Sequence, residues 1–523
     1  MSIETVYFLA PEIVLIAMAV AIYILGAAAT SQSTVPWKGL AIIALAAAGA
    51  LLFLPPGDAI VGPIQVDALG LFTGGFSIVV GLLLVRMSAR PAATRGDAEY
   101  IGSLLLCVAG LMLTALARDL VLLFVSLELI SIPTYVVLYL GRRDSAAREA
   151  TAKYFYLSIL ASAIFLYGLS FLYGVTGETD LLKIHSRLVE IGSTAGSLGA
   201  LTKIALVLIF AGLGFRITAV PFHFYAPDVY QGSSHTNAAL LSVIPKAAGM
   251  VVLVRLAVVA MPGTEPFGWR VAMALSLVTM TLGNVVALWQ GNLRRLLAYS
   301  SIAHAGYLLI GLSVALSGSN PIPGWDGVGA LLFYLCAYAL ATIGAFAALV
   351  YLGRRDRQVD TVAELAGLAR TRPLLATVLA VFMFSLAGIP PLAGFWGKLL
   401  IFGSALMVDA GPTSGEGRRT WFIALAIAGV VNSAIAAAYY LRVVATMYFR
   451  APLGTLRAEG GRGSWVVAMA CAILVVALGL YGRPLVQWSM AASPTSKIDE
   501  ASDRPADGPR RMGWNYQNGS IAK

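Results

Sequence analysis

Charged residues are scarce in this sequence: they make up 12% of its 523 residues, against about a quarter in an ordinary soluble domain. Hydrophobic residues make up 59%. These proportions exclude a soluble globular protein and indicate an integral membrane protein. The net charge of +10 does not indicate a nucleic-acid partner, because the basic residues fall mostly in short gaps between apolar runs, where they set membrane topology.

Cysteine and histidine are also rare. Cys107, Cys336 and Cys471 lie singly in apolar segments, so we interpret them as small core side chains. Of the four histidines, only His304 lies well inside an apolar run, which excludes the paired axial ligands of a membrane haem. The sequence has no Walker A motif, and "GLG" at 212–214 follows no strand. We therefore expect no metal, redox-cofactor or nucleotide site in this chain.

Long apolar runs are abundant. Runs of about 20 apolar residues are long enough to cross a bilayer as helices, and these runs lack the alternation of barrel strands. The sequence therefore predicts an all-α integral membrane protein with about fourteen transmembrane helices. The predicted spans lie near residues 5–27, 38–55, 66–87, 98–117, 119–140, 149–174, 201–222, 234–260, 267–289, 293–317, 326–352, 373–407, 419–449 and 464–490.

The connections between these runs indicate an orientation. Lys and Arg number 18 at or near the odd-numbered connections and 7 at the even-numbered ones. Positive-inside counting places the odd-numbered connections in the cytoplasm and both termini on the outer, periplasmic side. The opening "MSIETVYFLAPE" has no cationic region before the first apolar run, so it does not resemble a cleaved signal peptide.

Five ionisable residues interrupt the apolar runs, each in a different predicted helix. They are Glu128, Arg216, Lys246, His304 and Lys398. A charge at the centre of a bilayer costs about 2.5–3.5 kcal/mol on insertion scales, so such groups are normally paired or face hydrated cavities. Ionisable groups inside a membrane mark ion or proton pathways by default.

Prolines break two of the predicted spans. We assign Pro221 and Pro227 to the seventh span, and Pro390 and Pro391 to the twelfth. Each proline removes a backbone donor and frees a carbonyl. Broken spans five helices apart, each with a nearby cation, predict a transporter with two inverted five-helix repeats and discontinuous helices 7 and 12.

These breaks suggest an organisation in five parts. We predict an N-terminal three-helix segment at 1–97, a first repeat (helices 4–8) at 98–260, a second, inverted repeat (helices 9–13) at 261–450, a C-terminal helix 14 at 451–490 and a polar extramembrane tail at 491–523.

Structural interpretations compete with these functional ones. Glu128 can be one half of an ion pair that fixes two helices, and His304 can be a hydrogen-bonded core residue. Lys153 lies near a helix start, where its side chain can reach the membrane interface. Arg255 lies nearer the end of a span, and this position favours a structural role for it.

Four stretches of the sequence resemble one family. The segments "RRDSAAREATAKYF", "GLGFRITAVPFHFYAPDVYQG", "QGNLRRLLAYSSIAHAGYLLIG" and "SLAGIPPLAGFWGK" are similar to the antiporter-like membrane subunits of the proton-pumping NADH:quinone oxidoreductase, respiratory complex I. The resemblance extends from about residue 5 to 490. It implies the same fourteen helices, two inverted repeats and broken helices 7 and 12.

The resemblance also implies roles for individual residues. Glu128 corresponds to the family's glutamate of helix 5, Lys153 to the lysine of helix 6 and Lys246 to the lysine of helix 8. His304 corresponds to the histidine of helix 10 on the conduction path, and Lys398 to the helix 12 lysine at the exit side.

The sequence departs from the family pattern at two places. Arg216 stands where the family commonly has lysine; arginine keeps the positive charge but does not release its proton near neutral pH. We therefore expect Arg216 to act as a fixed cation that keeps Glu128 ionised. The second departure is "GSSHTN" at 232–237, where the family typically has a Gly-Ala-Pro-Thr-Pro-like turn.

The function expected from this resemblance is proton translocation in the bacterial plasma membrane. The driving reaction, electron transfer from NADH to quinone, is expected in partner subunits that hold FMN, iron–sulfur clusters and quinone. The expected partners are membrane and peripheral-arm subunits of complex I, neighbouring antiporter-like subunits among them, and membrane lipid. An alternative is a D-type subunit of a multisubunit cation/proton antiporter, and a third is a redox-catalytic subunit with its own quinone or haem site, which the missing histidine pairs disfavour.

Overall fold

The computed structural model describes residues 3–28, 35–53, 59–88, 96–142, 144–195, 199–261, 267–318, 324–353, 358–409, 417–452 and 458–494. The predicted polar tail lies outside the described residues from position 495 onward. The same holds for several of the cations used to predict orientation, namely Arg90, Arg95, Arg143, Arg354, Arg355, Arg357 and Arg457.

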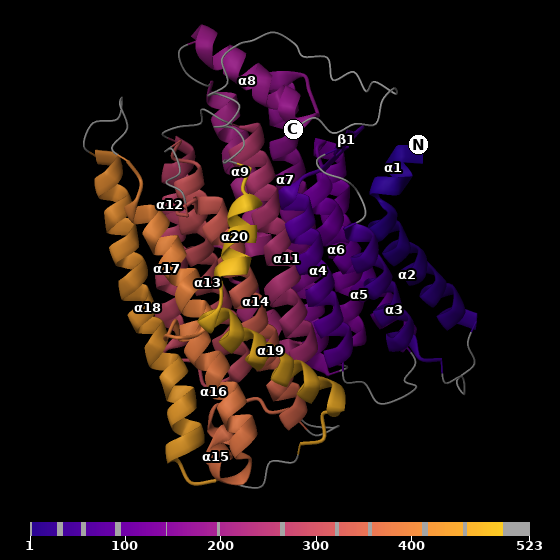
Figure 1. Ribbon diagram of the computed structural model, residues 1–523, viewed down its shortest axis with the longest axis vertical. Helices are drawn as coiled ribbons and strands as arrows, with labels where there is room; N and C mark the ends of the chain where they lie inside the picture. Colours follow the sequence, from indigo (N-terminus) through magenta and orange to yellow (C-terminus); the bar gives the residue numbers. More distant parts are fainter. Residues whose placement is uncertain are drawn as a thin grey trace, which may run out of the picture.

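The described chain is almost entirely helical (Figure 1). The α-helices are α1 (Ile3–Phe8), α2 (Ala10–Ala28), α3 (Trp37–Leu52), α4 (Ala68–Met87), α5 (Asp97–Leu116), α6 (Leu120–Leu140), α7 (Ser145–Thr176), α8 (Leu181–Ala195), α9 (Ala200–Ile217), α10 (Ala226–Gly232), α11 (His235–Leu253), α12 (Phe267–Ala287), α13 (Leu293–Ala315), α14 (Gly327–Leu352), α15 (Leu368–Thr371), α16 (Pro373–Ala387), α17 (Ala393–Leu406), α18 (Gly417–Phe449), α19 (Arg462–Leu480) and α20 (Arg483–Ala491).

Three kinds of smaller element complete the described structure. A π-helix, η1 (Val254–Ala260), continues α11, and a short 3-10 helix, η2 (Ala363–Leu365), precedes α15. Strands β1 (Ala59–Val61) and β2 (Ile64–Val66) form an antiparallel hairpin in which Ala59 pairs with Val66.

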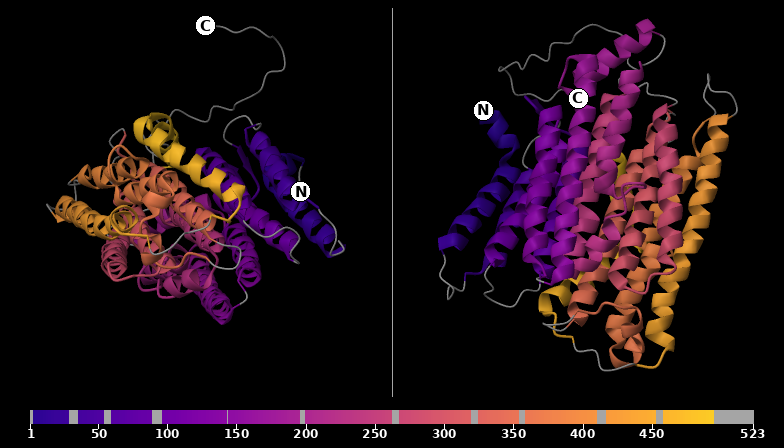
Figure 2. Two further views of the ribbon diagram at one scale, coloured as in Figure 1. Left: turned by 90° about the horizontal axis from the view of Figure 1, so that it is seen from below. Right: turned by 180° about the vertical axis from the view of Figure 1, so that it is seen from behind.

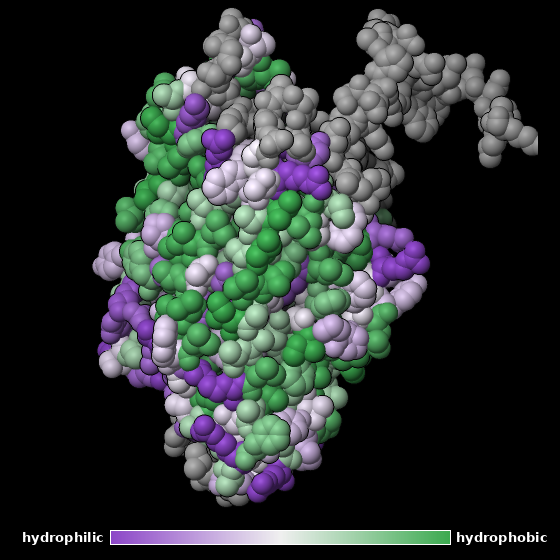
Figure 3. Space-filling model, turned by 90° about the vertical axis from the view of Figure 1, so that its left-hand side faces the viewer, coloured by the Kyte–Doolittle hydropathy of each residue, from purple (hydrophilic) through white to green (hydrophobic). Residues whose placement is uncertain are grey.

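The predicted membrane-helix fold class is confirmed. In the described residues, 12 helices are long and apolar enough to cross a membrane, and α3, α16 and α17 are shorter apolar helices. Figure 3 shows a broad hydrophobic area on the side of the molecule that carries α18, with hydrophilic residues toward its lower end. Such an apolar lateral surface is the one that lipid covers.

The helices run roughly parallel in an elongated bundle (Figure 2). The helices α2 and α3 lie at one edge of the bundle, and α18 lies at the opposite edge. The β-hairpin and α8 lie at one end of the molecule, called here the α8 end, and α15 lies at the other, the α15 end (Figure 1). The spans formed by α11 with η1, by α13 and by α14 are almost completely buried, so they form the centre of the bundle.

Polar residues at the edges of apolar runs begin several of these helices. The side chain of Asp67 accepts a hydrogen bond from Gly70 N at 2.8 Å, and Asp144 accepts one from Ala147 N at the same distance. Such caps satisfy N–H groups that a helix start leaves without partners. The same device recurs at the starts of other long helices, at Asp119, Asn292 and Asp326.

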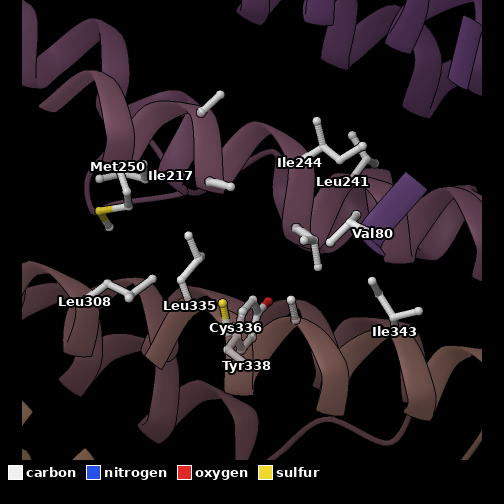
Figure 4. Close-up of a cluster of buried hydrophobic side chains, with 14 of the residues drawn as sticks. Val80, Ile217, Leu241, Ile244, Met250, Leu308, Leu335, Cys336, Tyr338 and Ile343 are labelled. Carbon is white, nitrogen blue, oxygen red and sulfur yellow. The ribbon is translucent and has the colours of Figure 1, made fainter. Parts of the chain in front are cut away.

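Apolar packing joins the two central helices α11 and α14. Figure 4 shows Leu241 and Ile244 of α11 in one cluster with Leu335, Tyr338 and Ile343 of α14. Tyr338 is the polar residue among these five, and it lies between the two buried helices (Figure 4).

Two helical paths are interrupted near the predicted prolines. Residues 218–225 separate α9 from α10 and contain Pro221, while Pro227 stands in the first turn of α10. Residues 388–392 separate α16 from α17 and contain Pro390 and Pro391. A proline has no N–H to donate, which suits it to positions where the helical hydrogen bonding stops.

A buried ion pair ties the N-terminal helices to the first half of the bundle. Arg255 of η1 donates to both carboxylate oxygens of Asp67, at 2.7 and 2.8 Å, and its Nε donates to Ala115 O at 3.1 Å. The Arg255 side chain is 2% exposed and that of Asp67 12%. The pair therefore joins the start of α4, the end of α5 and η1.

We expect Asp67→Ala to lower the thermal stability of the protein, because it leaves the Arg255 cation buried without a counter-ion. Removing one partner of a buried pair costs about 3–5 kcal/mol. The measurement is the thermal unfolding midpoint in detergent. The control is Glu190→Ala, which removes a partner of the exposed Arg187–Glu190 pair and should change stability by about 1 kcal/mol or less. Equal midpoints for the two variants would contradict the role given to Asp67.

Candidate functional site

The first part of the site is an ion pair between Glu128 of α6 and Arg216 of α9. Arg216 Nη2 donates to Glu128 Oε1 at 2.9 Å. The side chain of Arg216 is 5% exposed and that of Glu128 25%. Since Arg216 lies in the last turn of α9, the negative end of that helix dipole also favours its charge.

Hydroxyl groups complete the surroundings of this pair. Ser162 of α7 donates to Glu128 Oε1 at 2.6 Å, and Arg216 Nη1 donates to Ser131 Oγ at 2.7 Å. Arg216 also donates to Leu127 O at 3.3 Å. Three helices, α6, α7 and α9, thus hold the two charges in one network, as buried charges require.

The second part is Lys246, which lies near the middle of α11 and is fully buried. Its Nζ donates to Ser301 Oγ of α13 at 2.6 Å and also to Ser301 O. It lies 4.9 Å from the centre of the Tyr338 ring, a cation–π distance. In the described part of the chain no carboxylate forms an ion pair with this lysine.

The third part is His304 of α13, which is 2% exposed. Its Nδ1 lies 2.5 Å from the hydroxyl of Tyr334 on α14, and its Nε2 lies 3.1 Å from the hydroxyl of Tyr440 on α18. Tyr440 also shares a hydrogen bond with Ser300. Both ring nitrogens therefore contact groups that can donate or accept a proton.

The fourth part is Lys398 of α17. Its Nζ donates to Ala387 O at 2.8 Å and to Ser433 Oγ at 2.7 Å. Ala387 is the last residue of α16, so its carbonyl is one of those that a helix end leaves free. Gly388 has φ +89°, and a Cβ there would lie 2.8 Å from Lys398 Cδ. The break between α16 and α17 thus supplies both the acceptor and the space for this lysine.

Aromatic and hydroxyl side chains connect the three central groups. The His304 ring lies 4.9 Å from the Tyr338 ring that covers Lys246. On its other side, Lys398 lies 5.1 Å from the Tyr307 ring, which is 5.7 Å from the His304 ring. A buried polar line therefore runs from Lys246 through His304 to Lys398 across the centre of the bundle.

Lys153 lies apart from this line. Its Nζ contacts Glu149 Oε1 at 2.7 Å and Asp228 Oδ2 at 3.1 Å, and its side chain is 41% exposed. Asp228 also accepts from Arg295 at 2.7 Å. The structure thus places Lys153 in a surface network of α7, α10 and α13.

Several polar groups of the site were not anticipated from the sequence. The tyrosines are Tyr307, Tyr334, Tyr338 and Tyr440, and the serines that bind the charges are Ser131, Ser162, Ser301 and Ser433. Tyr334 and Tyr338 are spaced four residues apart in an apolar run, which places both on one helix face. That spacing was an available signal.

Another group missed by sequence reasoning is Glu12 of α2. It is 2% exposed, and neither of its carboxyl oxygens has a hydrogen-bond partner. In the part of the chain that the structure describes, no three or more His, Cys, Asp or Glu side chains are arranged to hold a metal ion.

Comparisons with known proteins agree with this arrangement. Residues 117–413 match the family model described as "NADH:quinone oxidoreductase/Mrp antiporter, TM". NADH-quinone oxidoreductase subunit N of Trichlorobacter lovleyi is 37% identical over 447 residues, which cover 84% of this chain and 87% of that protein. A chain of respiratory complex I from Thermus thermophilus, solved with bound aureothin, superposes with a TM-score of 0.74 at 33% identity, covering 91% of this chain and 98% of that one.

A further solved structure shares the fold at lower identity. It is a chain of the Mrp complex from Dietzia sp. DQ12-45-1b, with a TM-score of 0.78 at 23% identity, covering 95% of this chain and 99% of that chain. The class is therefore that of antiporter-like membrane proteins. Within it, the chain belongs to the NADH-quinone oxidoreductase subunit N family, which confirms the resemblance found in the sequence.

The ion pair at residue 216 gives a specific prediction. Arg216→Lys retains the cation and should preserve most of the NADH-driven proton pumping of the complex. Arg216→Ala leaves Glu128 with Ser162 as its remaining partner among the described residues, and it should lower pumping about tenfold or more, because the carboxylate loses the cation that we expect to keep it ionised. The measurement is the initial rate of proton uptake into membrane vesicles. If the Arg216→Ala variant assembles and pumps protons at the rate of the parent, Glu128 and Arg216 are not functionally paired.

Proposed function

We propose that this chain moves protons across the bacterial plasma membrane as the subunit N of a proton-pumping NADH:quinone oxidoreductase. The observation that carries this proposal is the buried polar line from Lys246 to Lys398, with the Glu128–Arg216 pair in the same half of the chain as Lys246. Because each such group is costly to insert, ionisable groups in a membrane interior mark transport pathways by default.

The two lysines are suited to pass protons. Their Nζ atoms contact only hydroxyl and carbonyl groups and aromatic rings among the contacts described above. A buried lysine without a counter-ion exchanges its proton more readily than a lysine in water. His304 lies between them with a tyrosine hydroxyl at each ring nitrogen, so it can accept a proton at one nitrogen and release one from the other.

The Glu128–Arg216 pair acts as an electrostatic switch in this proposal. While the pair is closed, the arginine neutralises the carboxylate. When the two groups separate, the field that they exert on Lys246 changes, and the proton affinity of the lysine changes with it. Arg216 remains charged throughout, because arginine does not release its proton near neutral pH.

The energy for pumping comes from outside this chain. Moving one proton against ~150–200 mV requires about 3.5–4.6 kcal/mol. In the proposed complex, the partner subunits hold FMN, iron–sulfur clusters and quinone and carry out electron transfer, while this chain contributes the proton path. Its partners are the other membrane and peripheral-arm subunits, neighbouring antiporter-like subunits among them, and lipid.

The proposal includes the finer topology predicted from the sequence. We treat α9 with α10, and α16 with α17, as the discontinuous helices 7 and 12 of a fourteen-helix protein. Residues 98–260 and 261–450 are then two inverted repeats, between a segment at 1–97 and a helix at 451–490. The interruptions at 218–225 and 388–392 support this assignment, because broken helices at corresponding positions mark the sites of inverted-repeat transporters.

The α15 end is proposed to face the cytoplasm, with both termini on the periplasmic side. The Lys and Arg counts of the connections support this orientation. A cation/proton antiporter subunit of the Mrp type is the second candidate, since a chain of an Mrp complex has the same fold. Flavin and NADH oxidation in the purified native complex favour the first candidate; their absence favours the second.

Substitution of the path lysines tests the proposed function. Lys246→Ala and Lys398→Ala should each lower NADH-driven proton pumping and the coupled electron transfer about tenfold or more, at the low end of the ~10²–10⁴-fold typical of proton-transfer groups. Glu128→Gln should act in the same direction while nearly keeping the side-chain shape. Vesicle acidification and NADH oxidation are measured on the same membranes, with assembly checked by native gel electrophoresis. Unchanged pumping in an assembled lysine variant would remove that lysine from the path.

Cysteine labelling tests the orientation. The native cysteines Cys107, Cys336 and Cys471 are buried, so they give a low background for a membrane-impermeant maleimide. Glu459→Cys, at the α15 end, should react in inside-out vesicles and stay unreactive in right-side-out vesicles. Glu190→Cys on α8 should show the opposite pattern. Reversal of both patterns would place the α15 end outside.

A further inference from the structure

A second buried histidine, His235, has no role in the polar line described above. It lies at the start of α11 and is fully buried. Its Nε2 lies 3.0 Å from Val359 O; since a carbonyl only accepts, Nε2 carries the hydrogen. The other nitrogen, Nδ1, is then an acceptor, and it has no hydrogen-bond partner.

Polar residues of α11 connect His235 with Lys246. Ser242 follows His235 by seven residues, and Lys246 follows Ser242 by four. These spacings place all three on one face of the helix. At 1.5 Å per residue, His235 lies about 16 Å from Lys246 along the axis, on the side of the α15 end, where Val359 also lies.

The neighbouring helix α14 carries a matching face. Phe346, Thr342 and Tyr338 are spaced four residues apart, so they also share one face. The Phe346 ring lies 6.1 Å from the His235 ring, and Tyr338 donates to Ser242 O at 3.3 Å.

Between these two contacts, Thr342 is buried, and its Oγ1 lies near the Tyr338 side chain without a hydrogen bond of good geometry. The two helix faces thus meet at both ends, with a partnerless polar atom on each. Buried polar atoms almost always bond to protein or to ordered water. Water is therefore the expected partner of both His235 Nδ1 and Thr342 Oγ1.

We propose that His235 is the first proton-carrying group of an inlet that leads from the α15 end to Lys246. His235 Nδ1 and Thr342 Oγ1 hold a short file of water between α11 and α14, and this file ends at the Tyr338–Ser301–Lys246 contacts. Nδ1 takes an excess proton from a protonated water on the surface side, which becomes neutral water, and passes it to the water on the Lys246 side, which hands it on to the neutral amine of Lys246. The ring ends neutral, with Nε2–H still bonded to Val359 O.

The charged groups around His235 do not replace it as a carrier. Arg294 is paired with Asp360 at 2.7 Å, and Arg142 is paired with Asp144. Arginine does not release its proton near neutral pH, and both carboxylates are engaged by cations. The imidazole is therefore the group at this position that is suited to exchange protons.

This inference rests on the proposed function, and the experiment separates the two. The intact complex is studied in inside-out vesicles with NADH, comparing the parent with His235→Gln, His235→Ala and Thr342→Val. Glutamine keeps a donor for Val359 O but carries no proton, and valine keeps the shape of threonine without its hydroxyl. His185→Gln is the control, because His185 also bonds a backbone carbonyl, Val259 O at 2.8 Å, and lies on α8 at the other end.

We expect His235→Gln to lower the proton-pumping rate about tenfold, less than the ~10²–10⁴-fold of direct acid–base groups because waters remain in the inlet. Thr342→Val should also slow pumping, and His185→Gln should leave the rate unchanged. Added imidazole should raise the rate of His235→Ala several-fold without raising that of the parent or of His185→Gln. This rescue requires a proton carrier and is not expected of a residue with a structural role only.

Pumping at the parental rate by assembled His235→Gln would overturn the inlet, as would failure of imidazole to rescue assembled His235→Ala. If His235→Ala does not assemble, the proton-pumping rates of His235→Gln and Thr342→Val test the inlet. Parental rates in both variants would overturn it. Absence of NADH-driven pumping in the parent complex would instead overturn the proposed function.

Discussion

The cost of holding a charge in a medium of low dielectric constant constrains the whole structure. The described charges at interior positions have partners that offset this cost, with the exception of Glu12, whose two carboxyl oxygens have none. Arg216 has Glu128 and two serines, Arg255 has Asp67 and a carbonyl, and the path lysines have hydroxyls and carbonyls. The partners differ in kind: the arginines have carboxylates, whereas the lysines have neutral groups, and this difference is the basis on which we propose the lysines as proton carriers.

The interruptions of the helices follow from the same constraint. In a continuous helix each carbonyl already accepts a helical hydrogen bond, so a buried cation must share it, as Lys246 shares Ser301 O, whereas a helix end leaves carbonyls free. The end of α16 leaves Ala387 O free, and Lys398 donates to it. Arg216 lies in the last turn of α9, just before the interruption at 218–225, but its guanidinium donates to groups of α6 and α7. At the α16–α17 interruption, the helix break therefore supplies an acceptor for the buried lysine.

The sequence predicts the charged part of the site better than the neutral part. Glu128, Lys246 and Lys398 stand out because a charge in an apolar run is costly to insert and therefore rare. Tyr334 and Ser301 do not stand out, since tyrosine and serine are common in buried helices and only tertiary packing brings them to His304 and Lys246. The composition likewise predicts that the protein is a bundle of membrane helices. It does not predict which helices pack against each other, because that depends on contacts between side chains that lie far apart in the sequence.

The central claim is that separation of Glu128 from Arg216 accompanies proton movement through the lysines. Infrared difference spectroscopy on the intact complex, started by NADH, tests it directly, because a carboxylate that loses its cation changes its stretching band or takes up a proton. We predict a carboxyl signal that appears during turnover and is missing from Glu128→Gln. A spectrum in which the parent and Glu128→Gln are identical throughout turnover would contradict the account.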